Sequence, residues 1–170
     1  MVVLIAGASH VGKTVLAQKL LEERGWPYLS LDLLKMGLIR SGQTPLTPED
    51  DGKLTGYLWP IASEMVKTAI ENGQNLVVEG CYIPFNWGDS FTLEYRKHIR
   101  YVCLVLSEGF IRGHFTDVLA HASDIEKRLD DESFTMEHAL RENAQWQAGC
   151  QEAGLPYVLI DGTYNVPIEF

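Results

Sequence analysis

The feature that most constrains the fold is the octapeptide G-A-S-H-V-G-K-T at residues 7–14, because of what stands on either side of it. Residues 2–6 form an unbroken apolar run rich in β-branched side chains, which predicts a strand buried on both faces. Residues 14–24 carry an apolar stripe at helical spacing and are followed by Gly25, which is typical of a helix and its C-terminal cap. The sequence therefore predicts a strand, a glycine-containing loop and a helix in direct succession.

The octapeptide fits the pattern G-x-x-x-x-G-K-[ST] of a phosphate-binding loop. Gly7 and Gly12 permit backbone conformations and close approaches that a Cβ atom would prevent. Backbone N–H groups at the start of the helix would point at an anion, with support from the helix dipole. Lys13 would neutralise the outer phosphates and act in catalysis, and the Thr14 hydroxyl would ligate magnesium. We expect the whole loop to bind ATP: Gly7, Ala8, Ser9, His10, Val11, Gly12, Lys13 and Thr14.

Length and composition set the class of protein. The 170 residues suit a single domain, and a hydrophobic content of 46% with 22% charged residues is typical of globular proteins. No apolar run reaches the length of a membrane span, and no basic leader precedes the first strand, so we expect a cytoplasmic protein without a membrane partner. A formal net charge of −9 argues against nucleic acid as a partner. The three widely spaced cysteines are expected to be reduced and structural.

Apolar runs alternate with helical segments along the chain. The predicted strands are residues 2–6, 28–31, 75–78, 101–106 and 157–160. This alternation predicts an α/β fold with a parallel sheet covered on both faces by helices. Residues 47–50, T-P-E-D, predict a helix start with Thr47 as the cap, and Pro60 is expected to kink or divide that helix. The last long helix is expected at about residues 133–151.

This layout resembles the P-loop kinases built like the nucleoside monophosphate kinases, a group that includes adenylate kinase, shikimate kinase, chloramphenicol phosphotransferase, 2-phosphoglycerate kinase and the zeta toxins. The resemblance implies a P-loop NTPase three-layer α/β sandwich, with a five-stranded parallel sheet in order 2-3-1-4-5, helices on both faces and a helical lid. It also implies Mg²⁺-dependent transfer of the γ-phosphoryl group of ATP to a small-molecule acceptor. We expect one kinase domain over residues 1–170, with an acceptor-binding region at about 33–72 and a lid at about 108–132.

Two carboxylates follow predicted strands at the edge where ligands bind in such sheets. Asp32, in Y-L-S-L-D, is predicted to orient the acceptor hydroxyl, as an Asp at the matching position does in chloramphenicol phosphotransferase-like kinases. The alternative is that Asp32 caps a helix beginning at Leu33. Glu79, in N-L-V-V-E-G, is predicted to hold magnesium through water or to contact the acceptor, and its alternative is an ion pair with Lys13.

The segment S-L-D-L-L-K-M-G-L-I-R offers cations for the acceptor. Lys35 and Arg40 are predicted to hold a phosphate or carboxylate of the acceptor, and the alternative is two solvated charges. The segment is similar to G-D-L-L-R of adenylate kinase with Lys35 in the Arg position, but V-V-E-G-C-Y-I-P-F-N-W lacks the Arg of D-G-F-P-R. A hydroxyl acceptor is therefore favoured, and a nucleoside monophosphate is the alternative. The segment G-C-Y-I-P-F-N-W at residues 80–87, which contains Tyr82, is predicted to form an aromatic acceptor pocket with Tyr57 and Trp59. The alternative is that these aromatic side chains belong to the core.

The predicted lid follows the fourth strand. Arg112 and Arg128 are predicted to supply catalytic cations when the site closes, because Arg suits the spread charge of phosphate. In the family the loop after the fifth strand lies beside the adenine, which would place residues 161–165 there. A nucleotide-dependent switch is less favoured, since no N-K-x-D segment occurs. The sequence leaves the acceptor's identity and the oligomeric state open.

Within the lid, four polar residues have helical spacing. His114, Asp117, His121 and Asp124 fall at i, i+3, i+7 and i+10 and would share one face of a helix. No second ligand cluster accompanies them, and closed metal sites need four ligands in tight geometry. Solvated charge is therefore favoured over a metal site.

Overall fold

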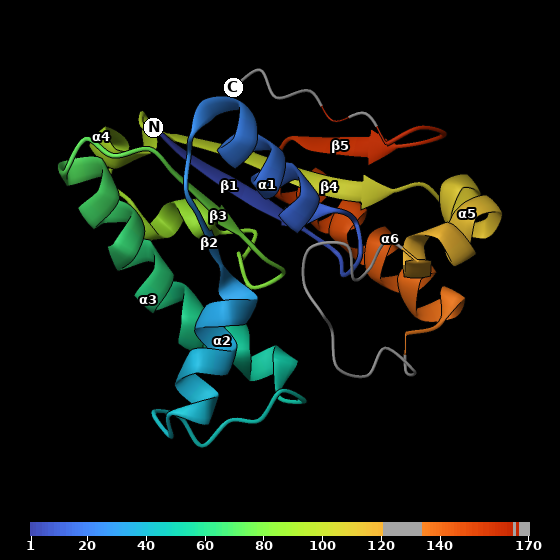
Figure 1. Ribbon diagram of the computed structural model, residues 1–170, viewed down its shortest axis with the longest axis horizontal. Helices are drawn as coiled ribbons and strands as arrows, with labels where there is room; N and C mark the ends of the chain where they lie inside the picture. The colour runs from blue at the N-terminus through green and yellow to red at the C-terminus, as the bar shows by residue number, and fades with distance from the viewer. Residues whose placement is uncertain (121–133, 165, 167–170) are drawn as a thin grey trace.

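The computed structural model describes residues 1–120, 134–164 and 166 of the chain (Figure 1). Strands and helices alternate along it, as the sequence predicts. In chain order the elements are β1 (Val2–Gly7), α1 (Lys13–Arg24), β2 (Tyr28–Ser30), α2 (Leu31–Arg40), α3 (Asp51–Glu71), β3 (Leu76–Glu79), the 3-10 helix η1 (Trp87–Ser90), α4 (Leu93–Arg96), β4 (Ile99–Leu106), α5 (Glu108–Ala120), α6 (Met136–Ala153) and β5 (Tyr157–Ile160).

The five strands form one parallel sheet in the order β2-β3-β1-β4-β5. This is the order that the resemblance to the P-loop kinases implies. Glu79, the last residue of β3, pairs with Ile5 of β1 on one side and with Ser30 of β2 on the other. The carboxyl ends of three neighbouring strands therefore meet at one edge, where the predicted site residues begin.

Helices cover both faces of the sheet and form two hydrophobic clusters (Figure 1). The cluster on one face includes Leu54 and Leu58 of α3 and Cys150 of α6. The cluster on the other face includes Leu16 of α1 and Ile111 of α5. All six residues of β1 are buried, because β1 is the central strand and has helices on either side. The loop that follows β1 is thus attached to a fully buried central strand.

Two predicted helix boundaries differ from the structure. Helix α3 begins at Asp51, because the Asp50 carboxylate accepts hydrogen bonds from the backbone N–H and hydroxyl of Thr47 and folds residues 47–50 into a turn. Helix α6 begins at Met136, after a Thr135 hydroxyl that accepts a hydrogen bond from the His138 backbone N–H.

Of the predicted kink or division of α3 at Pro60, the division is wrong. Pro60 lies inside one continuous helix of 21 residues. Leu58 and Ala62 on either side of it are fully buried in the core, so packing holds the helix together across the missing backbone N–H.

The predicted lid lies only partly within the described residues. Helix α5 accounts for its beginning, with a non-helical backbone at His114 (φ −131°, ψ 19°). Residues 121–133 are outside the described part of the chain. None of the described helices combines the length and apolar character that crossing a membrane requires.

Candidate functional site

The loop between β1 and α1 contains two glycines with positive φ angles, as the sequence motif predicts. Gly7 and Gly12 have φ angles of 137° and 85°. A Cβ atom on Gly7 would lie 2.3 Å from the Leu104 carbonyl oxygen of β4. Gly12 is the N-cap of α1, and no side chain caps this helix, so its first backbone N–H groups have no helical or side-chain partner. This arrangement is suited to an anion.

The remaining loop residues divide into buried and accessible positions. Ala8 and Val11 are buried in the core, whereas Ser9, His10 and Thr14 are half-buried. His10 has a φ angle of 61°, and its ring centroid lies 4.0 Å from that of Phe134.

Lys13 is folded beneath the loop. Its side chain is 6% exposed, and Nζ donates a hydrogen bond to the Ala8 carbonyl oxygen at 2.6 Å. An ammonium group is costly to bury unless it is paired, and the Ala8 carbonyl oxygen is the partner here. The Lys13 ammonium group therefore places a positive charge beneath the loop, next to the N-terminus of α1. Glu79, at 1% exposed, is the other ionisable Lys, Arg, Asp or Glu side chain that is buried among the described residues. The two belong to neighbouring strand ends, since Glu79 pairs with Ile5, two residues before the loop.

Glu142 of α6 contacts the phosphate-binding loop, and sequence reasoning missed it. Its Oε1 accepts hydrogen bonds from the backbone N–H and the hydroxyl of Ser9, at 3.1 and 3.4 Å. Its Oε2 lies 3.6 Å from Nε2 of His138, one helical turn earlier. The contact joins residues 133 apart in sequence, so no local pattern indicates it.

Tyr164, after β5, lies against the other end of the loop. Its hydroxyl donates a hydrogen bond to the Gly12 carbonyl oxygen at 2.8 Å. A Cβ atom on Gly12 would lie 2.6 Å from the Tyr164 ring. Although part of the ring is exposed, burial raises the pKa of the Tyr164 hydroxyl. The segment predicted to line the adenine pocket thus borders the loop, while Asn165, its last residue, lies outside the described residues.

A second group of polar side chains lies on the β2 side of the loop, and we call it the Asp32 network. Lys35 Nζ lies 2.8 Å from Asp32 Oδ1 and donates a hydrogen bond to the Tyr82 hydroxyl at 2.9 Å. The Tyr82 hydroxyl donates in turn to Asp51 Oδ1 at 2.7 Å. Helix α2, the segment after β3 and the start of α3 each contribute to it. Three of its members, Asp32, Lys35 and Tyr82, were predicted as site residues, and Asp51 was missed.

Local structure explains where Asp32 and Tyr82 lie. Helix α2 follows β2 directly with Ser30 as its N-cap, so Asp32 is in the first turn and does not cap a helix at Leu33. That alternative is wrong. Tyr82 is only 3% exposed, and burial, the neighbouring Cys81 and the hydrogen bond to Asp51 raise the pKa of its hydroxyl.

Cys81 precedes Tyr82 of the Asp32 network in the chain. The pKa of its thiol is raised to about 11, chiefly by burial; Asp32 and Glu142 also raise it, and Lys13 and Lys35 lower it. Charged groups of the phosphate-binding loop and of the Asp32 network therefore both act on the Cys81 thiol.

Two other predicted residues, Arg40 and Arg112, are exposed. Arg40 is exposed in the last turn of α2. Arg112 is exposed, forms an ion pair with Glu108 at 2.8 Å, and lines a cavity of about 410 Å³ between α5 and α6. Arg128 lies outside the described residues.

The structure separates the members of the predicted aromatic acceptor pocket: Trp59 is a core residue, Tyr82 belongs to the Asp32 network, and Phe85 and Trp87 line a cavity that is described below. Trp59 is buried in the core, where its Nε1 donates a hydrogen bond to the Ser90 hydroxyl. The Tyr57 hydroxyl donates to the Gln43 carbonyl oxygen. These aromatic side chains contribute packing, which is the commoner use of such residues.

The predicted histidine and aspartate stripe is described only in its first half. His114 Nδ1 lies 3.2 Å from Asp117 Oδ2 on an exposed face of α5. His121 and Asp124 lie outside the described residues. Within the described ranges, no three His, Cys, Asp or Glu side chains gather as a metal site.

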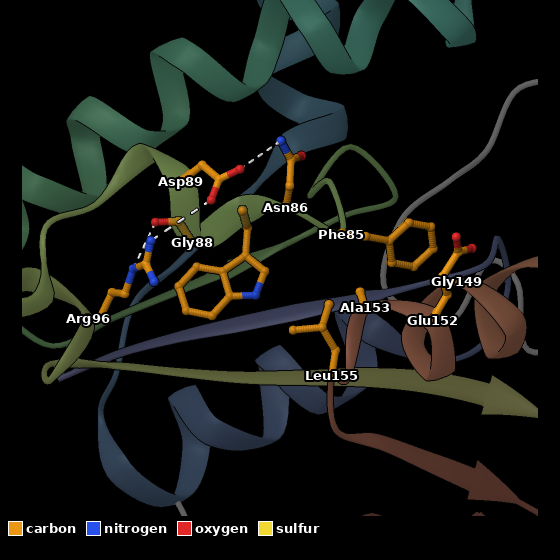
Figure 2. A pocket seen from close by; sticks show the side chains of 10 residues that line it. Phe85, Asn86, Gly88, Asp89, Arg96, Gly149, Glu152, Ala153 and Leu155 are labelled. Atoms are coloured by element: carbon orange, nitrogen blue, oxygen red, sulfur yellow. Dashed lines mark hydrogen bonds and ion pairs between the residues drawn. The ribbon is translucent and has the colours of Figure 1, made fainter.

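A second cavity, of about 580 Å³, lies away from the phosphate-binding loop (Figure 2). It is enclosed by the segment after β3 and the C-terminal end of α6, close to where β4 and β5 begin. Figure 2 shows Arg96 at one side, where its Nε donates to the Gly88 carbonyl oxygen, and Phe85 and Leu155 toward α6. Phe85 and Trp87, which belong to the segment predicted to form the aromatic acceptor pocket, line this cavity.

Comparisons with known proteins were made by sequence and by structure. No protein-family model matches the sequence, and no curated protein matches it in sequence. The structure is similar to that of shikimate kinase from Bacteroides thetaiotaomicron, with 14% identity, a TM-score of 0.53, and 95% of this chain and 86% of that chain covered. It is also similar to a protein from Chloroflexus aurantiacus assigned as a kinase, with 18% identity, a TM-score of 0.51, and 96% and 88% covered. At these identities the likeness is one of fold, and it confirms the predicted α/β fold with a five-stranded parallel sheet.

Proposed function

We propose that the protein is an ATP- and Mg²⁺-dependent phosphotransferase that moves the γ-phosphoryl group of ATP to a hydroxyl of a small molecule. The observation that carries the proposal is the loop of residues 7–14, with Lys13 buried beneath it and the uncapped N-terminus of α1 beside it. The fold shared with shikimate kinase supports the proposal by analogy.

The residues present fit Mg²⁺ and a nucleotide. Lys13 donates to a backbone carbonyl oxygen, a partner that it can exchange for a phosphate oxygen without leaving a buried charge unpaired. The Thr14 hydroxyl and, through water, the Glu79 carboxylate would hold Mg²⁺, which prefers oxygen ligands and keeps several waters. When bound, Mg²⁺ would neutralise the charge of the outer phosphates.

The residues around the loop would have different roles in the reaction. Asp32 would accept a hydrogen bond from the acceptor hydroxyl and orient it for in-line attack, because phosphoryl transfer depends chiefly on positioning. Arg112 and Arg128 would supply cations as the lid closes and water leaves. We further propose that the protein acts in the cytoplasm, where ATP is available and its three cysteines would stay reduced; the described cysteines are free thiols.

The test is a coupled assay of ADP release with ATP and Mg²⁺ over a panel of hydroxyl compounds and nucleoside monophosphates. At least one acceptor should stimulate ADP release above the rate without acceptor. Lys13→Ala should abolish this stimulation. Lys19→Ala is the matched control, because Lys19 is an exposed lysine of the same helix that pairs only weakly, at 3.9 Å, with Glu23.

Acceptor-independent ADP release, with tight ATP binding, would instead favour a nucleotide-dependent switch. Stimulation by a nucleoside monophosphate, but by no simple hydroxyl compound, would favour a nucleotide kinase.

A further inference from the structure

The side chain of Lys35 is held by groups of the protein itself. Resting on the proposed function, we infer that Lys35 is a positioning residue: it fixes the Asp32 carboxylate for the acceptor hydroxyl, and Tyr82 in turn fixes Lys35. The sequence predicts a different role, in which Lys35 binds a phosphate or carboxylate of the acceptor. Asp32 has a further interaction besides this ion pair, so Lys35 is one of the groups that fix it.

Two contacts fix the ammonium group of Lys35. Its Nζ lies 2.8 Å from Oδ1 of Asp32, which precedes it by three residues in α2. The same nitrogen donates a hydrogen bond to the Tyr82 hydroxyl at 2.9 Å. Two of the three donors of the ammonium group are thereby used within the protein. Because only 13% of the Lys35 side chain is exposed, salt screens this ion pair less than a pair on the open surface.

Tyr82 is suited to anchor Lys35 because it is buried and stays protonated. Its side chain is 3% exposed and belongs to the hydrophobic cluster that includes Leu31, the residue before Asp32. Its hydroxyl donates to Asp51 Oδ1 at 2.7 Å, and its oxygen still accepts from Lys35. Burial, the neighbouring Cys81 and the hydrogen bond to Asp51 raise the pKa of this hydroxyl, so its proton remains in place.

The exposure of Asp32 explains why it needs such support. Asp32 lies in the first turn of α2, and 33% of its side chain is exposed. A group that orients a hydroxyl for in-line attack must keep its oxygen within hydrogen-bond reach, and a displacement of about 1 Å costs about a hundredfold in rate. The contacts from Asp32 through Lys35 and Tyr82 connect α2 to the start of α3 at Asp51. They therefore restrict the positions that the Asp32 carboxylate can take.

The ion pair also lies on the side of the sheet where the phosphate-binding loop begins. Asp32 follows β2, the loop follows β1, and β3 alone separates these two strands in the sheet. The charges of Asp32, Lys35 and Lys13 all act on the Cys81 thiol, just after β3. Asp32 is therefore placed to orient an acceptor hydroxyl toward a phosphate group held by the loop.

The experiment separates positioning of Asp32 from binding of the acceptor. Steady-state kinetics are measured with ATP, Mg²⁺ and the acceptor of the panel that gives the highest rate, and active protein is counted from the stoichiometry of ATP binding. Lys35→Met keeps an apolar side chain of similar length but removes the ammonium group. We expect kcat to fall by about tenfold to about a hundredfold, while KM for the acceptor changes by less than about twofold.

Two further variants complete the set. Tyr82→Phe removes one hydrogen bond of about 1 kcal/mol and should lower kcat by about fivefold, again with little change in KM. Lys53→Met is the matched control, because Lys53 also pairs with an aspartate three residues earlier, at 2.9 Å from Asp50, but its side chain is 73% exposed. This variant should keep the native kcat and KM.

The other outcomes overturn the inference. A rise in acceptor KM that exceeds the fall in kcat of Lys35→Met would show that Lys35 binds the acceptor, and it would leave the proposed function intact. Native kinetics in Lys35→Met, or an equal fall of kcat in Lys53→Met, would also overturn the positioning role, and native kinetics in Tyr82→Phe would overturn the part that concerns Tyr82. If no acceptor is turned over above the rate of Lys13→Ala, both the inference and the proposed function are contradicted.

Discussion

The hydroxyl of Tyr164 donates a hydrogen bond to the carbonyl oxygen of Gly12 at 2.8 Å, across 152 residues of sequence. The bond attaches the segment after the last strand to the residue that caps α1. With Glu142 bonded to Ser9, the loop is held at both ends by distant parts of the chain. Such contacts fix the loop before a ligand arrives, so that less ordering free energy is lost on binding.

Tyr164→Phe should weaken ATP binding with little effect on the chemical step. Loss of one hydrogen bond of about 1 kcal/mol corresponds to an increase of about fivefold in KM for ATP, while kcat stays nearly constant. The measurement is steady-state kinetics with ATP varied. Tyr157→Phe is the control, because the Tyr157 hydroxyl bonds to Gln147 and Gln151 on α6. A fall in kcat with KM unchanged would assign Tyr164 to the reaction itself and contradict the account.

Gly12→Ala should abolish ATP binding, whereas Gly25→Ala should cost only stability. Both glycines have left-handed φ angles, 85° and 68°, so both substitutions strain the backbone by about 1 kcal/mol. Only at Gly12 would the new Cβ meet the Tyr164 ring, at 2.6 Å, while nothing lies within 4 Å at Gly25. Calorimetric ATP titration together with thermal unfolding separates the two effects. Equal loss of ATP affinity in both variants would show that the close contact at Gly12 does not matter.

Glu142→Gln should tighten ATP binding by a few-fold. The glutamine keeps an acceptor oxygen for Ser9 but removes a negative charge beside the loop that would receive the phosphates. The effect should shrink as salt is raised, because Coulomb repulsion at a half-buried site is partly screened. Direct ATP titration at low and high salt measures it. Glu152→Gln, at the far end of α6, should leave affinity unchanged; weaker binding in Glu142→Gln would indicate that the carboxylate supports the loop.

The Cys81 thiol should react slowly at neutral pH. Burial raises its pKa from 9.0 to about 11, so the reactive thiolate is scarce until strongly alkaline pH. Iodoacetamide labelling of the native protein from about pH 7 to about pH 11, read by peptide mass spectrometry, should rise with a midpoint well above that of the unfolded chain. A midpoint at or below the unfolded value would contradict the burial of this thiol.

The same shift has a consequence for stability. Because the folded-state pKa of Cys81 is raised, its contribution to the free energy of unfolding is complete below the unfolded pKa near 9.0. That contribution is lost as pH rises through the interval up to about 11, and Cys81→Ser should lack this part of the alkaline loss. Chemical denaturation at several alkaline pH values compares the two proteins. Parallel stability profiles would contradict the assignment.

The parts of the site that sequence reasoning found are those with local signals. Residues 7–14 form one contiguous motif between a strand and a helix, and their geometry follows from the two glycines. Asp32 and Glu79 could be selected because each follows or ends an apolar strand, and parallel strands end at one edge of the sheet. The strand order itself came from the family resemblance, and the sheet confirms it.

The parts that sequence reasoning missed depend on tertiary contacts. Asp51 and Glu142 reach their partners across 31 and 133 residues, and nothing in their own neighbourhoods distinguishes them from surface side chains. The prediction for Trp59 failed for a related reason. Trp59 points into the core because α3 packs against the sheet on that face, and its periodicity alone does not separate core from pocket.

The central claim is that this loop binds ATP and passes its γ-phosphoryl group to a hydroxyl. The most direct test is ³¹P NMR of the protein with ATP, Mg²⁺ and the best acceptor of the panel. The account predicts that ADP resonances and a new phosphomonoester resonance grow together in equal amounts, and that neither appears with Lys13→Ala. Growth of inorganic phosphate alone, or ATP that persists unchanged with every acceptor, would contradict it.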